Sequence, residues 1–202
     1  MSAMAEAKSP GRPRCQETRG AILRAAYELL ESGGLAAFTI EAVAERSGAA
    51  KTTIYRWWPN KGFLAMESFL RVAEQQSPFP ETDSARADLR AHLHLFAKSL
   101  RGRAGRLLTG IVAEAQKDPA TREAFIRSYV APRRQAARAL LERGIARGEF
   151  RRGLDVESVC DALYGFFYMR LLLAHASMDD AAVDRILDLV LNGIRLEQHT
   201  VA

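Results

Sequence analysis

The sequence predicts an all-α fold of about nine helices. Apolar residues recur at helical spacing along most of the chain, and glycine or proline residues separate the amphipathic stretches. We find no segment with the sustained alternation of apolar and polar residues that is typical of a half-buried strand. The 202 residues, 48% of them hydrophobic, are enough to bury one sizeable core or two smaller ones.

Four helices are expected before residue 77. They are predicted at Glu17 to Ser32, from Ile40 to about Ser47-Gly48, at Ala50 to Trp58 and at Lys61 to Gln75. Gly33-Gly34 ends the first pattern, and Pro59-Asn60 separates the third helix from the fourth. Glu41 lies in the first turn of the second helix, where an acidic side chain suits the positive helix end.

A linker and five further helices follow. Ser77-Pro78-Phe79-Pro80, with the polar residues after it, is the clearest linker because it combines two prolines with turn-forming side chains. The later helices are expected around Leu89 to Leu100, at Leu107 to Ala115, at Ala120 to Arg147, at Asp155 to Ala176 and at Met178 to Leu196. Pro132 removes a backbone donor, so we expect the long helix from Ala120 to Arg147 to be kinked or split there.

Net charge and composition limit which partners, cofactors and cellular locations this chain is expected to have. A formal net charge of +5 favours an anionic partner but does not separate a nucleic-acid binder from a basic enzyme. Cys15 and Cys160 lie far apart, and the histidines are scattered, so we expect no disulfide, no metal and no other cofactor. Arg170 interrupts the longest apolar run and no signal-like stretch is found, so we expect a cytoplasmic protein outside the membrane.

The segment from Ile40 to Trp58 has the form of a helix-turn-helix, in which a second short helix enters a major groove of DNA. Ile54 and Trp58 are four residues apart and would face inward. The other side of that second helix carries hydrogen-bond donors, which suits DNA. Trp57 and Trp58 are interpreted as packing residues, because double-stranded DNA offers no splayed bases for stacking.

From Thr18 to Phe69 the sequence resembles the TetR family of regulators. It carries, in order, an amphipathic helix, a threonine before IEAVAERSG, the run KTTIYR, an aromatic residue and a PNK start to the next helix. Ala49-Ala50 lacks the hydroxyl that often caps this helix in the family, and Gly62 stands where an acidic residue is common. These departures concern the details of contact rather than the fold.

The resemblance and the residue types together predict the DNA contacts. Phosphate contacts are expected from hydroxyls and from one helix start, at Thr39, Thr53, Tyr55 and Lys61. Base contacts are expected from Lys51, Thr52 and Arg56, with a phosphate as the alternative partner of Arg56. Arg12 and Arg14 resemble arginines of an extended arm in the minor groove, and a solvated terminus is the alternative.

For the rest of the chain, the resemblance implies a helical shell around an apolar pocket and a four-helix dimer interface. We expect a flexible basic arm at residues 1–16, a DNA-binding domain at 17–63 and a ligand-binding and dimerisation domain at 64–202. The candidate pocket residues are Phe96, Leu107, Ile111, Phe125, Tyr129, Tyr164 and Phe167, with plain core packing as the alternative for each. The candidate interface residues are Val159, Cys160, Leu163, Phe166, Arg170, Ile186, Leu189 and Val190.

These expectations combine into one functional hypothesis: a homodimeric regulator, in the family usually a repressor, that binds a palindromic double-stranded operator. In the DNA-bound state the two recognition helices would lie roughly 34 to 36 Å apart. A small apolar or amphipathic effector would release the DNA by favouring a different separation. One alternative is a helical small-molecule-binding protein or enzyme without DNA function, although the sequence has no acid/base pair or phosphate-binding glycine loop. The other is a DNA-binding protein without an effector.

Overall fold

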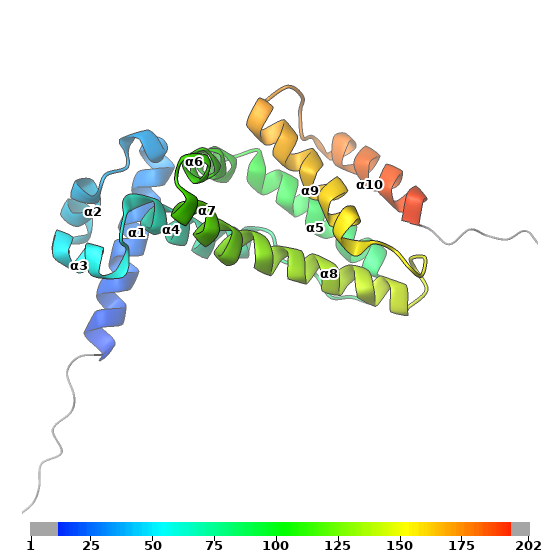
Figure 1. Cartoon of the computed structure of the whole chain (residues 1–202), viewed down its shortest axis with the longest axis horizontal. Helices are drawn as coiled ribbons and strands as arrows, with labels where there is room; N and C mark the ends of the chain where they lie inside the picture. Colours follow the sequence, from blue (N-terminus) through cyan, green and yellow to red (C-terminus); the bar gives the residue numbers. More distant parts are fainter. Residues whose placement is uncertain (1–11, 195–202) are drawn as a thin grey trace, which may run out of the picture. The chain divides into compact units, whose positions relative to one another are not determined.

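A computed structural model describes residues 12–194, and these form helices and connecting turns without a strand (Figure 1). The helices are α1 (Arg12–Ala37), α2 (Ile40–Ser47), α3 (Lys51–Trp57), α4 (Lys61–Gln76), α5 (Ala85–Leu100), α6 (Arg103–Lys117), α7 (Pro119–Phe125), a π-helical turn η1 (Ile126–Val130), α8 (Ala131–Ala146), α9 (Val156–Leu173) and α10 (Asp180–Ile194). Because α7, η1 and α8 run on without a break, residues 12–194 contain nine helical rods. The predicted all-α fold is confirmed.

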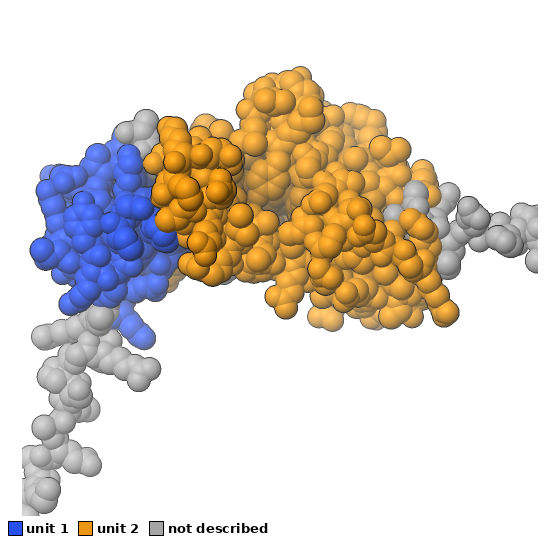
Figure 2. Space-filling view, in the orientation of Figure 1, with its two compact units in different colours: residues 1–68 blue, residues 69–202 orange. Residues whose placement is uncertain are grey.

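The chain divides into two compact units, residues 1–68 and residues 69–202, which Figure 2 colours separately. The division falls inside α4, so the first half of this helix belongs to unit 1 and the second half to unit 2. The expected boundary after residue 63 lies in the first turn of the same helix.

The first helix of unit 1 begins earlier than expected, at Arg12 rather than Glu17. A proline is tolerated in the first turn of a helix because its missing N–H would have no partner there, and Pro13 occupies such a position. Gly34 has φ 65° and ψ −175°, which interrupts the helical backbone and which glycine adopts without steric cost. The predicted stop at Gly33-Gly34 is therefore correct, although a short helical stretch to Ala37 follows it.

The ends of α2 have clear local causes. The Thr39 hydroxyl oxygen accepts a hydrogen bond from the amide of Ala42 at 3.1 Å, which satisfies one of the free donors at the helix start. Gly48 ends the helix in the left-handed region, at φ 68° and ψ 11°. This residue turns the chain directly into α3, so that α2 and α3 form the predicted helix-turn-helix.

A tryptophan and a glutamate tie the helices of unit 1 together. The Trp58 ring N–H, at the end of α3, donates to a carboxylate oxygen of Glu67 on α4 at 2.7 Å. The other carboxylate oxygen of Glu67 accepts from Arg19 of α1, whose guanidinium carbon lies 5.7 Å from the centre of the Trp58 ring. Because Trp58 is only 2% exposed, these contacts fix the start of α4 against the core of unit 1.

Unit 2 is a layered helical bundle in which α5 packs against α6, α8 and α10, and α9 packs against α6, α8 and α10 (Figure 1). Its core is formed by the apolar faces of these helices, including Leu89, Leu93, Phe96, Leu108 and Phe167. The α9 helix begins at an aspartate cap, Asp155, and ends at Ala174 in the left-handed region, slightly before the expected Ala176.

The predicted long helix from Ala120 to Arg147 is present as the continuous run of α7, η1 and α8. The π-helical turn at Ile126–Val130 lies just before Pro132, and the amide of Ala131 donates to the carbonyl of Ile126, five residues back. Pro132 has no N–H to offer the carbonyl four residues before it, and a widened turn is one way to accommodate that loss. The helix is therefore distorted at the predicted place but not split.

A buried aspartate anchors the linker that precedes α5. Asp88 is 1% exposed, and its carboxylate accepts from the amide of Thr82 at 2.9 Å, from the Thr82 hydroxyl at 2.7 Å and from Arg143. Burial alone would raise the pKa of Asp88, but the bonds from Thr82 and the charge of Arg143 hold this pKa below its ordinary value. Asp88 is therefore an anion that fixes the linker to α5 and α8.

Candidate nucleic-acid interface and ligand pocket

The α3 helix separates its buried and exposed residues as the sequence predicts. Ile54 has no exposed surface and Trp58 is 2% exposed, so both face the core of unit 1. The candidate contact residues form a continuous arc on the opposite side, with Thr53 half-buried and Lys51, Thr52, Tyr55 and Arg56 exposed. All of these side chains can donate hydrogen bonds, which suits the acceptors of phosphates and of base edges in the major groove.

An ion pair with α2, which the sequence analysis did not predict, occupies Lys51. Its ammonium lies 2.8 Å from a carboxylate oxygen of Glu41, and both side chains are more than half exposed. The hydrogen bond from Lys51 holds the pKa of Glu41 below its ordinary value. An exposed pair of this kind contributes little free energy, so Lys51 can exchange Glu41 for a base edge.

Arg56 is positioned by its neighbour. Its guanidinium carbon lies 5.2 Å from the centre of the Trp57 ring, and the Trp57 ring meets the Trp58 ring edge-on, with centroids 5.6 Å apart. The N–H groups of a stacked guanidinium lie in its own plane, so stacking leaves them free to donate. Both tryptophans thus pack within the motif, as interpreted from the sequence.

The start of α4 and the cap of α2 offer two places for a phosphate. Asn60 caps α4 by accepting from the amide of Phe63 at 3.0 Å, and Lys61 in the first turn is exposed. The positive end of the helix and the lysine charge act in the same direction on an anion. The Thr39 side chain is exposed, and because its oxygen only accepts from Ala42, its O–H can still donate.

The predicted minor-groove arginines lie in the first turn of α1, so the extended backbone expected for Arg12 and Arg14 is wrong. The cause is local: Pro13 is compatible with a helix start, and the residues after it are compatible with helix. The side chains of Arg12 and Arg14, and the rest of the expected arm at residues 1–11, lie outside the described residues.

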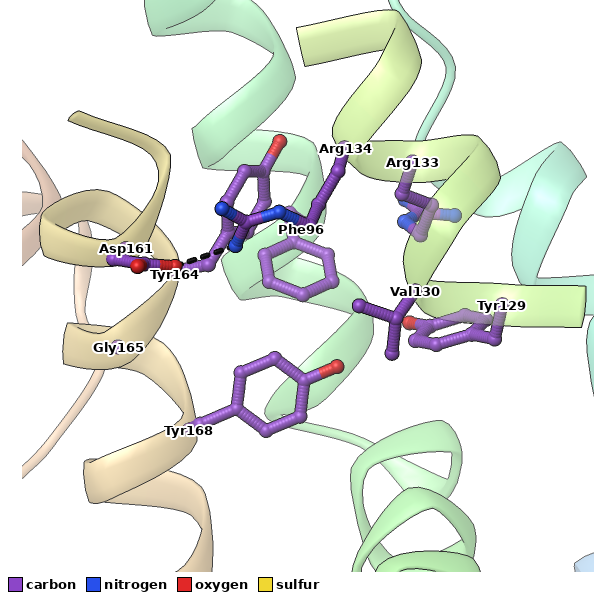
Figure 3. Close-up of a pocket in the computed structure, with 9 residues that line it drawn as sticks. All are labelled: Phe96, Tyr129, Val130, Arg133, Arg134, Asp161, Tyr164, Gly165 and Tyr168. Carbon is purple, nitrogen blue, oxygen red and sulfur yellow. Dashed lines mark hydrogen bonds and ion pairs between the residues drawn. The ribbon is translucent and has the colours of Figure 1, made fainter. Parts of the chain in front are cut away.

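Unit 2 contains a pocket of about 350 Å³ between α5, the η1–α8 run and α9 (Figure 3). It is lined by Phe96, Tyr129, Val130, Arg133, Arg134, Asp161, Tyr164, Gly165 and Tyr168. Three of the candidate pocket residues are therefore in the lining: Phe96, Tyr129 and Tyr164.

The other four candidates do not line this pocket, and the stated alternative of plain core packing describes them. Leu107, Ile111, Phe125 and Phe167 are all less than 8% exposed and belong to the core of unit 2. Phe167 meets Phe96 edge-on at a centroid distance of 5.3 Å, and Phe125 stacks on Tyr129 at the same distance. These two rings therefore support the pocket wall from behind.

The lining residues that the sequence analysis missed carry a helical signature. Asp161, Tyr164, Gly165 and Tyr168 follow the spacing of one helix face on α9. Val130, Arg133 and Arg134 follow the same spacing on the facing helix. Two facing stripes of mixed aromatic and charged residues could have indicated a pocket, but the apolar character of α9 favoured a dimer interface instead.

A buried histidine links the pocket to the linker. The Tyr164 hydroxyl donates to Nε2 of His92 at 2.9 Å, and Nδ1 of His92 donates to the carbonyl of Pro78 at 2.9 Å. The imidazole also stacks on Phe79 at a centroid distance of 3.7 Å. Burial, with a smaller contribution from the charge of Arg133, lowers the pKa of His92 to about 4, so this histidine is neutral at pH 7. His92 is thus a core residue whose two ring nitrogens are both hydrogen-bonded.

Arg133 connects the pocket to the same linker by a second route. One of its terminal nitrogens donates to the carbonyl of Ser77 at 3.1 Å and also to the Ser77 hydroxyl. Its guanidinium carbon lies 5.3 Å from the ring centre of Phe96 and 5.2 Å from that of Tyr129. A smaller cavity of about 250 Å³ shares Tyr129 and Arg133 with the pocket and is also lined by Ser77, Pro78 and Phe79.

Three candidate interface residues are covered within one chain. Val159, Cys160 and Leu163 are 7%, 1% and 1% exposed, so they pack in the core and offer no surface to a partner. All three lie on the face of α9 that meets the core of unit 2, and not on its outer face. Burial raises the pKa of the Cys160 thiol to about 11, which makes this cysteine unreactive at neutral pH.

An exposed apolar surface does exist on α9 and α10. Met169, Leu172 and Leu173 of α9 and Leu189 of α10 are 57%, 43%, 64% and 70% exposed. The candidates Phe166, Arg170, Ile186 and Val190 are half-buried on the same two helices, and the Arg170 guanidinium lies 4.2 Å from the Phe166 ring centre. We call Met169, Leu172, Leu173 and Leu189 the outer apolar face.

Metal-binding clusters and membrane-spanning helices are both absent from the described part of the chain. Among residues 12–194, no group of three or more histidine, cysteine, aspartate or glutamate side chains is arranged to hold a metal ion. None of the helices in this range is both long enough and apolar enough to cross a membrane.

Comparison with known proteins gives matches to both units. A family model described as "Bacterial regulatory proteins, tetR family" matches residues 22–66, which include the helix-turn-helix. A second model, described as "Tetracyclin repressor-like, C-terminal domain", matches residues 79–190.

Individual relatives match along nearly the whole chain. The HTH-type transcriptional regulator YdeS of Bacillus subtilis (strain 168) is 39% identical over 192 residues, which are 95% of this chain and 96% of YdeS. The DNA-binding transcriptional repressor TetR of Mycobacteroides abscessus is 29% identical over 177 residues, 87% of this chain and 93% of that protein. The crystal structure of the TetR family transcription regulator SCO0332 has a TM-score of 0.80 at 38% identity and covers 89% of this chain and 100% of its own.

Proposed function

Since this chain belongs to the TetR family of bacterial transcriptional regulators, we propose that it represses transcription as a homodimer on a palindromic operator and that a small molecule releases it. The chain is a helix-turn-helix DNA-binding regulator rather than an enzyme, in common with its relatives. The observation that carries the proposal is the arc of exposed donors on α3, opposite the buried Ile54 and Trp58.

The donor types divide into two groups. Thr39, Thr53, Tyr55 and Lys61 bind phosphates and set the register of the protein on the duplex. Lys51, Thr52 and Arg56 contact base edges, because lysine and arginine match the guanine acceptors and a threonine methyl matches the thymine methyl. Arg12 and Arg14 extend the contact into the adjacent minor groove from the start of α1.

The outer apolar face supports the homodimer. Four large apolar side chains at 43% to 70% exposure on α9 and α10 would remain in water in a single chain. A twofold axis through this face would pair α9 and α10 with their copies in a four-helix interface, which removes the same patch from water on both chains. Two recognition helices would then lie roughly 34 to 36 Å apart, the spacing of successive major grooves.

The contacts of the pocket support a ligand response. Two lining residues hold the first residues after α4: Arg133 bonds to Ser77, and Tyr164 bonds through His92 to Pro78. A ligand that moves either side chain would alter the contacts to Ser77 and Pro78, which directly follow the last turn of α4. The first turn of the same helix carries Lys61. Such a ligand acts only by binding one state of the protein more tightly than the other. This pocket favours an effector-regulated protein over an effector-independent one.

Selection of bound fragments from genomic DNA, followed by footprinting, tests the proposal. We expect the purified chain to protect an inverted repeat with half-sites about one helical turn apart. Small-molecule extracts of the source cells should then release this DNA in a mobility-shift assay. A stably monomeric protein, or one without preference among duplexes at low salt, would contradict the repressor proposal. If no extract releases the DNA, the proposal of an effector is contradicted.

A further inference from the structure

Arg133 differs from its neighbours on α8 in having no carboxylate partner. Arg134 pairs with Glu157 and Asp161, and Arg143 pairs with the buried Asp88. Within residues 12–194, no aspartate or glutamate forms an ion pair with Arg133, whose hydrogen bonds go to the carbonyl and hydroxyl of Ser77. The cation is thus held by neutral groups alone.

The surroundings of Arg133 make this lack of a counter-charge costly. The side chain lies over the rings of Phe96 and Tyr129, and its Nε atom is buried without an acceptor among the described residues. A buried N–H without an acceptor loses its water without compensation, and the loss is larger for a charged group. Because this Nε is closed to solvent, a ligand can reach only the terminal nitrogens, of which one is not bonded to Ser77.

The pocket beside Arg133 has a positive balance and aromatic walls. Asp161 and Arg134, both in its lining, neutralise one another, so that the charge of Arg133 remains. That charge is felt around the pocket, because it acts to lower the pKa of Tyr129, Tyr164 and Tyr168. Desolvation is nevertheless the larger effect and raises all three, so the phenols stay protonated at neutral pH.

Two of these phenols are available to a ligand. The Tyr164 hydroxyl is committed to His92, whereas the hydroxyls of Tyr129 and Tyr168 have no hydrogen-bond partner among the described residues. In Figure 3 these two hydroxyls point toward one another from the two helices that face each other across the pocket. The lining therefore offers a cation and two neutral donors between aromatic surfaces.

We propose that the pocket binds an aromatic carboxylate, with the carboxylate on Arg133 and the rings against Phe96 and the tyrosines. The proposal rests on the proposed function and names the chemical class of its effector. The volume of about 350 Å³ suits a molecule of one to three rings. The terminal nitrogen of Arg133 that does not bond to Ser77 can donate a charge-assisted hydrogen bond to a carboxylate, which gives the carboxylate a preference over a neutral oxygen of the same shape.

Calorimetric titration of the full-length chain with matched probes tests this assignment. The acids are benzoate, 2-naphthoate and 4-biphenylcarboxylate, and each is compared with the primary alcohol of the same ring system. We expect each acid that binds to do so at least about tenfold more tightly than its alcohol, the ratio that a net 1.4 kcal/mol provides. Equal affinity for acids and alcohols, or no binding of any acid at millimolar concentration, would overturn the proposal.

Three variants locate the preference. Arg133→Gln should bring the acid and alcohol affinities within about twofold of each other, and Arg133→Lys should retain only part of the preference because its compact ammonium is more strongly hydrated. Arg122→Gln removes the same charge from an exposed position on α7 and should leave the preference unchanged. A folded Arg133→Gln protein that keeps the full preference would overturn the assignment. If that variant does not fold, Arg133→Met, which removes the same charge, takes its place, and an undiminished preference in folded Arg133→Met would overturn the assignment in the same way.

Failure here and failure of the proposed function give different results. Probe binding requires no DNA, and operator binding is measured without probe. A chain that binds an operator but does not prefer the acids disproves the ligand class alone. A chain that prefers the acids but keeps its operator when saturated with them disproves release by this ligand and leaves the binding site intact.

Discussion

The proposed DNA-binding surface of unit 1 is built from one stretch of sequence between Thr39 and Lys61, whereas the pocket of unit 2 joins α5, α8 and α9. In unit 1 the caps, the turn glycine and the buried Ile54 and Trp58 fix which side chains face outward. In unit 2 the lining depends on which helices meet, and this is decided by contacts between residues far apart in the chain. A short motif can therefore define a binding surface, but a pocket requires the packed fold.

The largest effect on stability is expected from Trp58, which is buried in the core of unit 1. Trp58→Ala removes a 2% exposed ring and its bond to Glu67, and should lower the free energy of unfolding by about 3 to 5 kcal/mol. Trp57→Ala, at the adjacent half-buried position, should lower it by only about 1 kcal/mol. Denaturant titrations measure both, and equal losses would show that Trp58 does not anchor the motif.

The outer apolar face gives the next effect. Leu189→Glu places a charge on each copy at the proposed interface and should weaken self-association about a hundredfold, while Leu189→Ala should weaken it less. Sedimentation velocity over a concentration series measures the change. Because Leu189 is 70% exposed in one chain, the helical content of the monomer should not change. Unaltered self-association in Leu189→Glu would place the dimer contact elsewhere.

A pH dependence distinguishes unit 2. Burial lowers the pKa of His92 to about 4 in the folded chain, against about 6.5 when unfolded, so the unfolded state binds more protons between these values. The contribution of His92 to stability is complete above pH 6.5 and is lost as the pH falls toward 4. Between pH 7 and pH 5 the loss should be about 2 kcal/mol.

The matched variant for this prediction is His92→Leu, which removes the titrating group. It should be less stable at pH 7, because Pro78 and Tyr164 lose their partner, but it should lose about 2 kcal/mol less than the wild type between pH 7 and pH 5. Parallel stability curves for the two proteins would mean that His92 does not titrate in this range.

The smallest effect concerns a proposed phosphate contact of unit 1. Lys61→Ala should weaken binding to all duplexes and should flatten the plot of log affinity against log salt by about one unit. Lys98→Ala, at an exposed position on α5, is the matched loss of charge and should leave the slope unchanged. An unchanged slope in Lys61→Ala removes this lysine from the phosphate contacts.

The sequence was a good guide where local chemistry decides the structure. It predicted the helix-turn-helix, the breaks at Gly34 and Gly48 and the distortion before Pro132, since each depends on residues within one or two turns. It also predicted which side of α3 is buried, because Ile54 and the C-cap residue Trp58 are four residues apart and therefore lie on one face.

The sequence was a poorer guide where two faces of a helix are both apolar. Cys160 and Leu163 were predicted at an interface but are buried in the chain, because spacing alone does not say which apolar face of α9 meets the core. Phe125 and Phe167 were expected in the pocket but pack behind its wall. Arg133 was missed because an arginine is ordinarily an exposed residue.

The most direct test of the central claim is the preferred binding sequence of the wild type and of Arg56→Ala, determined by selection from a random duplex library. We expect the wild type to select an inverted repeat. We expect Arg56→Ala to lose preference at one symmetry-related pair of positions, at a cost of roughly 1 to 3 kcal/mol. A uniform loss across all positions would make Arg56 a phosphate ligand. A wild type that selects no sequence would contradict the claim that α3 reads DNA.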